Sequence, residues 1–145
     1  MDITVIAVGK LKEPYLAQGV EEACSRLRRR HQLRLIEVPD EGAPDRLGPS
    51  GRQAVLDREG ERILRAIPAQ SVVALLAVEG QPVNDEKFRK ILTSHPALTF
   101  VIGGSLGLGE RVKARGNLSV SLSPMTFPHQ LTRLLLLEEL NRLLS

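Results

Sequence analysis

Short apolar runs alternate with segments of helical periodicity along this chain, and this alternation constrains the fold more than any other feature. The run over residues 71–78 is almost continuously apolar, which is typical of a central parallel strand covered on both faces. The order and the short connections predict an α/β fold, with a mainly parallel sheet and helices on both faces. The predicted strands are residues 3–8, 33–38, 71–78, 98–102 and 118–122.

Helix signals lie between these strands. Ser50 and Gln53 have the spacing of a capping box, Asn84 can cap a helix, and Gly80-Gln81-Pro82 predicts a turn. Residues 39–50 contain three prolines and two glycines and are predicted to be a loop. The predicted helices begin at Pro14 and continue to the arginine cluster, then cover residues 51–66, 84–94, 110–115 and 129–144.

The composition fits one globular domain over residues 1–145. Apolar residues make up 42% of the chain and charged residues 26%, which is ordinary for a folded domain. No window approaches the roughly 18 unbroken apolar residues of a membrane span, and no basic region precedes the first apolar run, so no signal peptide is expected. The single cysteine, Cys24, excludes an internal disulfide and suits the cytoplasm. The scattered histidines show no metal-ligand spacing, and no metal is expected.

Basic residues gather between Arg26 and Arg34. Two interpretations stay open: a solvated helix end, because cations stabilise a helix C-terminus, or a surface that contacts phosphate. Aromatic residues are only 3% of the chain, so contact with RNA would depend mainly on charge and shape.

A glycine-rich segment, residues 103–109, directly follows the predicted fourth strand. Ligands in open α/β sheets bind beyond the carboxyl ends of the strands, and glycine lets the backbone approach a ligand closely. The dinucleotide fingerprint fails because Val112 stands where Gly or Ala is needed, which argues against a nucleotide-dependent oxidoreductase. No Gly-Lys-Ser/Thr follows, which excludes a P-loop. The alternative interpretation is a tight turn between strand and helix.

A second unusual segment, residues 122–129, carries Pro124 and Pro128. The two prolines stiffen a loop that cannot pair as a strand, and its backbone groups stay free to bind a ligand. Next to a glycine turn, such a loop suits the adenine and sulfonium groups of a methyl donor.

Five blocks of the sequence carry a resemblance to a known family. They are IAVGKLK at residues 6–12, IEVPDE at 36–41, EGERIL at 59–64, FVIGGS at 100–105 and MTFPHQ at 125–130. Together they resemble the RlmH family of SPOUT-class methyltransferases, the α/β-knot proteins, over nearly the whole chain. The last two blocks, in this order and spacing, are the most specific.

The resemblance implies an enzyme that transfers a methyl group from S-adenosylmethionine to N3 of a pseudouridine in 23S ribosomal RNA, on the assembled ribosome. It also implies a cytoplasmic homodimer and a C-terminal trefoil knot within a cofactor-binding region of about residues 71–145. The cofactor contacts carried over by the resemblance are Leu76, Gly103, Leu122, Ser123, Pro124, Met125, Thr126 and Phe127.

Catalysis at N3 requires the loss of a proton, so a base or an anion-stabilising cation is expected beside the donor. His129 and Arg133, one helical turn apart, are the candidates. Each has a structural alternative: His129 can cap the helix, and Arg133 can contact RNA phosphate or a carboxylate. The same helix has four consecutive leucines from Leu134 to Leu137, so it should bury more than one face, one against the sheet and another against a partner chain or within the core.

The sequence departs from the family near its end. Relatives carry a Tyr-Arg-Ala block in the last helix and continue to a Tyr-His-Lys end, whereas this chain has Asn141-Arg142-Leu143 and stops at Ser145. Ala77 replaces an acidic residue that is usual after the Leu76 position. The alternative function is therefore a catalytically impaired relative that binds the cofactor or the ribosome without the substrate tail.

Overall fold

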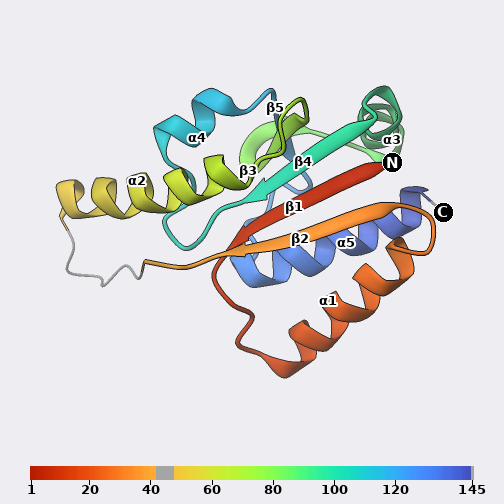
Figure 1. Cartoon of the computed structure of the whole chain (residues 1–145), viewed down its shortest axis with the longest axis horizontal. Coiled ribbons are helices and arrows are strands. Elements are labelled where there is room, and N and C mark those ends of the chain that lie inside the picture. The colour runs from red at the N-terminus through yellow and green to blue at the C-terminus, as the bar shows by residue number, and fades with distance from the viewer. Residues whose placement is uncertain (42–47, 145) are drawn as a thin grey trace.

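The computed structural model describes residues 1–41 and 48–144 and shows one five-stranded sheet in which every strand pairing is parallel. The strand order is β2-β1-β4-β3-β5, so the first strand lies inside the sheet (Figure 1). This confirms the predicted α/β class. The strands are β1 (Asp2–Val8), β2 (Gln32–Val38), β3 (Val72–Pro82), β4 (Ala97–Ile102) and β5 (Leu118–Ser121).

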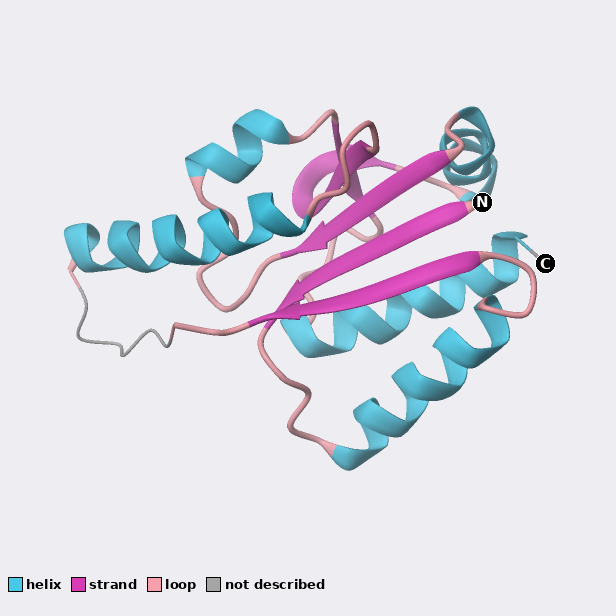
Figure 2. Ribbon diagram, viewed as in Figure 1, coloured by secondary structure: helices cyan, strands magenta, loops and turns pink. Residues whose placement is uncertain are grey.

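Helices cover both faces of this sheet, as Figure 2 shows. Helices α1 and α5 lie on one face together with α3, and α2 and α4 lie on the other. The loops that follow the carboxyl ends of the strands, drawn as arrowheads, gather at one end of the sheet. The two chain ends lie near each other at the opposite end. The helices are α1 (Pro14–Leu27), α2 (Pro49–Ala66), α3 (Asp85–Ser94), α4 (Glu110–Arg115) and α5 (His129–Leu144).

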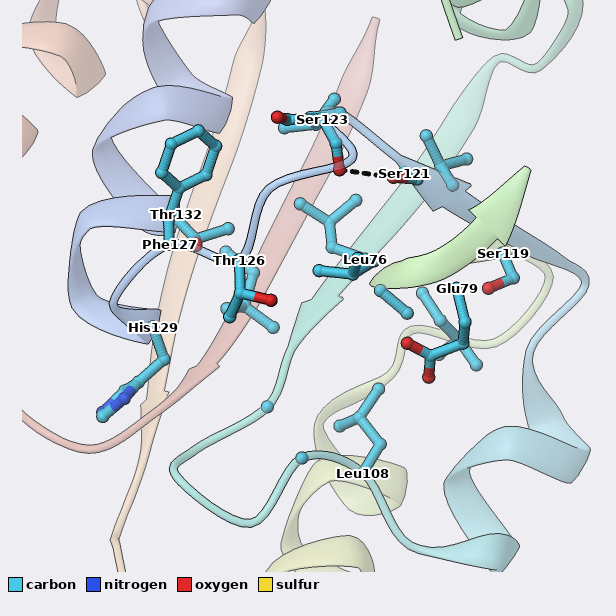
Figure 3. A pocket seen from close by; sticks show the side chains of 18 of the residues that line it. Leu76, Glu79, Leu108, Ser119, Ser121, Ser123, Thr126, Phe127, His129 and Thr132 are labelled. Carbon is cyan, nitrogen blue, oxygen red and sulfur yellow. Dashed lines mark hydrogen bonds between the residues drawn. The ribbon is translucent and has the colours of Figure 1, made fainter. Parts of the chain in front are cut away.

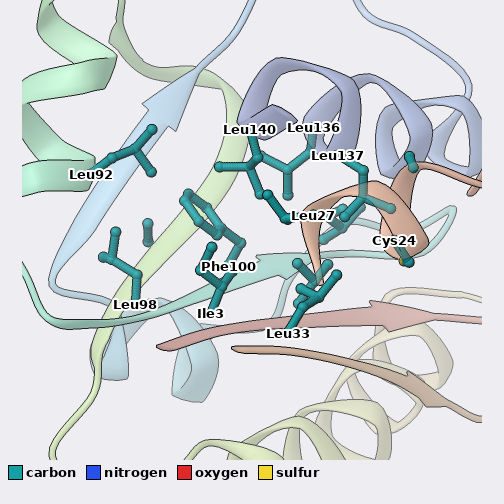
Figure 4. Packing of buried hydrophobic residues seen from close by; sticks show 14 of the residues in the cluster. Ile3, Cys24, Leu27, Leu33, Leu92, Leu98, Phe100, Leu136, Leu137 and Leu140 are labelled. Atoms are coloured by element: carbon teal, nitrogen blue, oxygen red, sulfur yellow. The ribbon is translucent and has the colours of Figure 1, made fainter. Parts of the chain in front are cut away.

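The larger core cluster lies between the sheet and helices α1 and α5. Leu136, Leu137 and Leu140 of α5 are fully buried and face Ile3 and Phe100 of the sheet (Figure 4). Burial on both faces explains why β1 and β4 have nearly continuous apolar sequences, because neither face of a central strand meets water.

The second apolar face of α5 packs against α1. Leu134 lies over Gly19, where an added Cβ would come within 3.1 Å of the leucine Cδ2. Asn141 Nδ2 donates to the carbonyl oxygen of Ala23, also in α1, at 2.9 Å. The prediction that α5 buries more than one face is confirmed, but α1 of the same chain occupies the second face, so the leucine pattern requires no partner chain there.

The predicted turn at Gly80-Gln81-Pro82 is wrong, because β3 continues through these residues. After an irregularity that follows Leu76, Gln81 pairs with Val120 and Pro82 with Ser121. A Cβ at Gly80 would lie 2.8 Å from the backbone nitrogen of Val120, so the missing side chain permits this close approach. Glycine and proline favour turns locally, but these residues are extended because they pair with β5, which lies far along the chain.

The two predicted helix caps have different outcomes. Asn84 Oδ1 accepts a hydrogen bond from the backbone nitrogen of Lys87 at 2.8 Å, which confirms the cap of α3. The capping box at Ser50 is wrong, because α2 begins at Pro49 and its N-cap residue is Gly48. Proline is favoured at the first helical position, where its missing N–H costs nothing. Within the predicted loop 39–50, residues 42–47 lie outside the described residues, as does Ser145.

Candidate functional site

A cavity of about 570 Å³ opens at the carboxyl ends of β3, β4 and β5 (Figure 3). Three segments form its walls: the middle of β3, the glycine-rich segment after β4, and the stretch from β5 into α5. Seven of the eight predicted cofactor contacts line it, namely Leu76, Gly103, Leu122, Ser123, Met125, Thr126 and Phe127. Pro124 does not line the cavity; it is an exposed residue between two that do.

Two serines organise the loop after β5. Ser121 Oγ donates to the carbonyl oxygen of Ser123 at 2.8 Å (Figure 3). Ser123 Oγ accepts from the backbone nitrogen of Met125 at 3.0 Å. The loop therefore keeps a defined shape although it belongs to no strand or helix, and it presents Leu122 and Phe127 to the cavity.

The glycine-rich segment folds back on itself beside this loop. The backbone nitrogen of Gly107 donates to the carbonyl oxygen of Gly104 at 3.0 Å, and Gly107 has a φ of +81°, which favours glycine. A Cβ at Gly103 would lie 2.6 Å from the carbonyl oxygen of Gly107. The segment is thus a tight turn between β4 and α4 and also one wall of the cavity.

Sequence reasoning missed two charged residues of the cavity, Glu79 and Lys113. In the view of Figure 3, Glu79 and Ser119 lie on the side opposite His129. Glu79 follows the apolar part of β3 at the edge where ligands bind, and this position was the signal that could have identified it. Lys113 lies on α4, where no motif distinguishes it from other surface lysines.

His129, the first residue of α5, lines the cavity as predicted, together with Thr132 and Leu135 of the same helix. Its ring points away from Leu76 and towards the loop that follows β1 (Figure 3). Histidine therefore stands at the mouth of the cavity, where it can reach a molecule that covers the opening.

Arg133 lies outside the cavity lining, with only 1% of its surface exposed. Its Nη1 donates to Glu37 Oε2 at 2.6 Å, and its Nη2 donates to the carbonyl oxygen of Gly9 at 2.9 Å. Of the alternatives considered for this residue, contact with a carboxylate is the one present in the structure. The guanidinium ties α5 to the carboxyl ends of β1 and β2.

A buried carboxyl group lies behind the glycine-rich segment. Glu59 of α2 is 5% exposed and accepts a hydrogen bond from the backbone nitrogen of Glu41 at 3.1 Å. Burial raises the pKa of Glu59, and the carboxylates of Asp40 and Glu41 raise it further, whereas the backbone hydrogen bond lowers it. A Cβ at Gly104 would lie 3.9 Å from Glu59 Oε1, so this carboxyl group borders the turn from behind.

The arginine cluster, residues 26–34, lies at the opposite end of the sheet from the cavity, where β2 begins. Arg26 pairs with Glu138, Arg34 pairs with Asp2 at 3.1 Å, and Arg28 Nε donates to the carbonyl oxygen of Leu33 at 3.2 Å. The contacts of Arg26 and Arg28 join the end of α1 to α5 and β2, and the Arg34 pair joins β2 to β1, so these three arginines have structural roles. The cavity stands at the carboxyl ends of the strands, so the cluster does not border it.

Three further features are absent from the described residues: a metal site, a reactive thiol and a membrane-spanning helix. No group of three His, Cys, Asp or Glu side chains is placed to hold a metal ion in the ranges 1–41 and 48–144. Burial raises the pKa of the Cys24 thiol, which keeps it protonated and a poor nucleophile. No described helix combines the length and the hydropathy that crossing a membrane demands.

Fold and cavity together define a methyltransferase of the SPOUT class. The family model described as predicted SPOUT methyltransferase matches residues 1–145, and the chain belongs to this family. It is 44% identical to ribosomal RNA large subunit methyltransferase H of Streptococcus gordonii, 45% to that of Carboxydothermus hydrogenoformans and 46% to that of Acetivibrio thermocellus. Each alignment covers 98% of this chain and 92% of the relative, which confirms the resemblance seen in the sequence.

A solved structure supports the fold independently. A probable methylase family protein from Haemophilus influenzae Rd KW20 superposes with a TM-score of 0.57 at 10% identity. The match covers 97% of this chain and 65% of that protein.

Proposed function

We propose that this protein transfers a methyl group from S-adenosylmethionine to N3 of a pseudouridine in 23S ribosomal RNA of the assembled ribosome. The observation that carries the proposal is the convergence of seven expected cofactor contacts on one cavity at the carboxyl edge of the sheet. The substrate class is supported by the relatives, which are named ribosomal RNA large subunit methyltransferases.

The cavity suits S-adenosylmethionine in size and in lining. Its volume of about 570 Å³ lies within the usual range for small-molecule sites. Leu76, Leu122 and Phe127 provide apolar surface for the adenine ring, and the loop backbone between them offers hydrogen-bonding groups. Glu79 adds a carboxylate that can interact favourably with a cationic donor. These residues are proposed to hold the donor, together with Gly103 in the close-packed wall after β4.

When bound, S-adenosylmethionine supplies an electrophilic methyl group on a sulfonium. The protein's own part is to align the acceptor nitrogen with that group and to exclude water, which lowers the barrier through proximity. His129 stands at the cavity mouth and is proposed to accept the N3 proton from the substrate. Arg133 is proposed to act indirectly, because its guanidinium holds Glu37 and Gly9 and thereby fixes the helix that carries His129.

We further propose that the protein works as a homodimer, as a single SPOUT domain whose C-terminal region, about residues 71–145, forms the knot. Support for the dimer comes from apolar side chains that remain exposed at the cavity: Met125 is 67% exposed and Val78 is 42% exposed. A second chain over this rim would cover both residues and narrow the opening of the site.

The test uses 70S ribosomes from a strain that lacks large subunit methyltransferase H, incubated with the purified protein and tritiated S-adenosylmethionine. The expected result is labelled 3-methylpseudouridine after digestion of 23S ribosomal RNA. A His129→Ala variant should lower kcat by about 10²- to 10⁴-fold with little change in donor affinity, since it removes a general base. Label in another nucleoside, or none despite donor binding in calorimetry, would refute the assigned reaction; the second outcome would favour a relative that binds without turnover.

A further inference from the structure

The loop between β1 and α1, residues 9–13, leaves the sheet at the same edge as the cavity. It carries two exposed lysines, Lys10 and Lys12. Neither forms an ion pair with a carboxylate in the described part of the chain. A loop with two uncompensated cations therefore stands beside a site that is proposed to receive a polyanion.

One side chain fixes this loop in place. The Gln130 amide accepts a hydrogen bond from the backbone nitrogen of Lys12 at 3.1 Å and donates one to the carbonyl oxygen of Lys10 at 3.0 Å. The amide thus pairs with the loop backbone much as a neighbouring strand would. Gln130 directly follows His129, and the His129 ring points towards this loop (Figure 3). The backbone that carries the two lysines is therefore fixed beside the first turn of α5, whose His129 lines the cavity.

The carboxylates around the loop leave these cations uncompensated. Asp40 lies behind Gly9 and hydrogen-bonds with Glu59, and Glu37 is paired with Arg133. Glu13 is the exposed acidic residue of the loop itself. Asp40 and Glu37 are thus engaged within the protein, and the loop, with two exposed lysines and one exposed glutamate, keeps a net positive charge.

We propose that Lys10 and Lys12 bind phosphates of the RNA strand that flank the target nucleotide, with Gln130 as the residue that positions both lysines. The inference rests on the proposed function and extends it to the substrate side of the site. A base can enter the cavity, but the phosphates on either side of it must stay at the rim because burying them unpaired is costly. Lysine ammonium groups are suited to bind them. Few aromatic side chains are available for stacking, so charge must supply much of the affinity.

The test measures the Kd of the protein for 70S ribosomes by sedimentation over a range of salt concentrations, and the KM for ribosomes in the methylation assay. The double variant Lys10→Gln/Lys12→Gln should raise both the Kd and the KM for ribosomes roughly tenfold. It should also flatten the slope of log K against log salt by about 0.7 to 0.9 for each lost phosphate contact. The Kd for S-adenosylmethionine and the value of kcat should stay unchanged, because neither lysine lines the cavity.

A matched control removes the same charge elsewhere. Lys87→Gln/Lys90→Gln changes two exposed lysines of α3 and should leave the KM for ribosomes near the wild-type value. Equal effects of the two double variants would overturn the proposal, since net charge alone would then explain them. A changed oligomeric mass of the Lys10→Gln/Lys12→Gln variant would also overturn it, and would assign the loop to a contact between copies.

The Gln130→Met variant tests the positioning role, because it keeps both lysines and removes both hydrogen bonds. An increase in the KM for ribosomes of a few fold, with the donor Kd unchanged, is expected. A wild-type KM would show that Gln130 does not position the loop. Failure of the wild-type protein to bind the donor or to methylate ribosomes would instead reject the proposed function, while the sedimentation assay would still report on the lysines.

Discussion

Gly103 has no room for a side chain, because the backbone of Gly107 lies against the position where a Cβ would stand. The Gly103→Val variant should therefore displace the turn that forms one wall of the cavity. Forcing a side chain into a packed site costs about 1–3 kcal/mol, so donor affinity in calorimetry should fall by roughly ten- to hundredfold. Gly48→Ala is the control, since nothing lies within 4 Å of its added Cβ. Wild-type affinity of a folded Gly103→Val protein would contradict the placement of the donor.

Glu59 carries a prediction about pH. Its pKa is raised in the folded protein, chiefly by burial, so the folded state favours the protonated carboxyl group. The stabilisation is fully present below the unfolded-state pKa of about 4.5 and is lost as the pH rises through the folded-state pKa. Glu59→Gln stays neutral and can still accept from the Glu41 nitrogen, so its melting temperature should exceed that of the wild type by a few degrees at pH 8 and match it near pH 4.

The control for this pH experiment is Glu61→Gln on the same helix, whose carboxylate is half-exposed and pairs with Arg65 at 2.8 Å. The difference between the melting temperatures of Glu61→Gln and the wild type should not grow comparably with pH. A constant gap between the Glu59→Gln and wild-type melting temperatures across the pH range would contradict the assignment.

At the scale of elements, Arg133 joins α5 to the ends of β1 and β2. Replacing it by methionine breaks a buried ion pair and a hydrogen bond to Gly9, and should lower the free energy of unfolding by about 3 kcal/mol. Urea unfolding followed by circular dichroism measures this. Arg34→Met, which breaks the exposed pair with Asp2, should cost less than about 1 kcal/mol. An Arg133→Met protein that is destabilised but keeps the wild-type kcat would contradict the positioning role proposed for Arg133.

Elements buried on both sides were the ones that the sequence predicted well. The continuous apolar runs of β1 and β4 have a local cause, since a central strand excludes water from both faces. The end of β3 was missed because Gly80 and Pro82 favour turns locally, while their pairing with β5 depends on a distant segment. Arg133 was placed on the correct helix, but its partners lie on other strands and leave no trace in the sequence spacing. Glu79 could have been identified by its position after the apolar part of β3, whereas Lys113 belongs to no motif and only the folded cavity identifies it.

At the scale of the whole molecule, the proposed dimer should have twice the 15.9 kDa mass of the chain in light scattering. Val78→Asp should shift the mass towards that of one chain, because it places a charge on an apolar rim that the partner would cover. Tyr15→Asp alters another exposed large side chain, remote in sequence from the cavity, and should leave the mass unchanged. The opposite pattern would move the interface to α1, and a wild-type mass of 15.9 kDa would remove the dimer from the proposal.

Because β1 lies inside the sheet, it can pair on both sides only after a much later part of the chain has been translated. Asp2 pairs with Gln32 on one side and with Ala97 on the other, so one edge of the first strand stays open until β4 has been translated. At a translation rate of about 5–20 residues per second, that edge stays unpaired for several seconds and is accessible to other nascent chains. The cavity walls extend from Leu75 to Leu135, so the donor can bind only after the first half of α5 has been translated. Early folding therefore proceeds without stabilisation by the ligand.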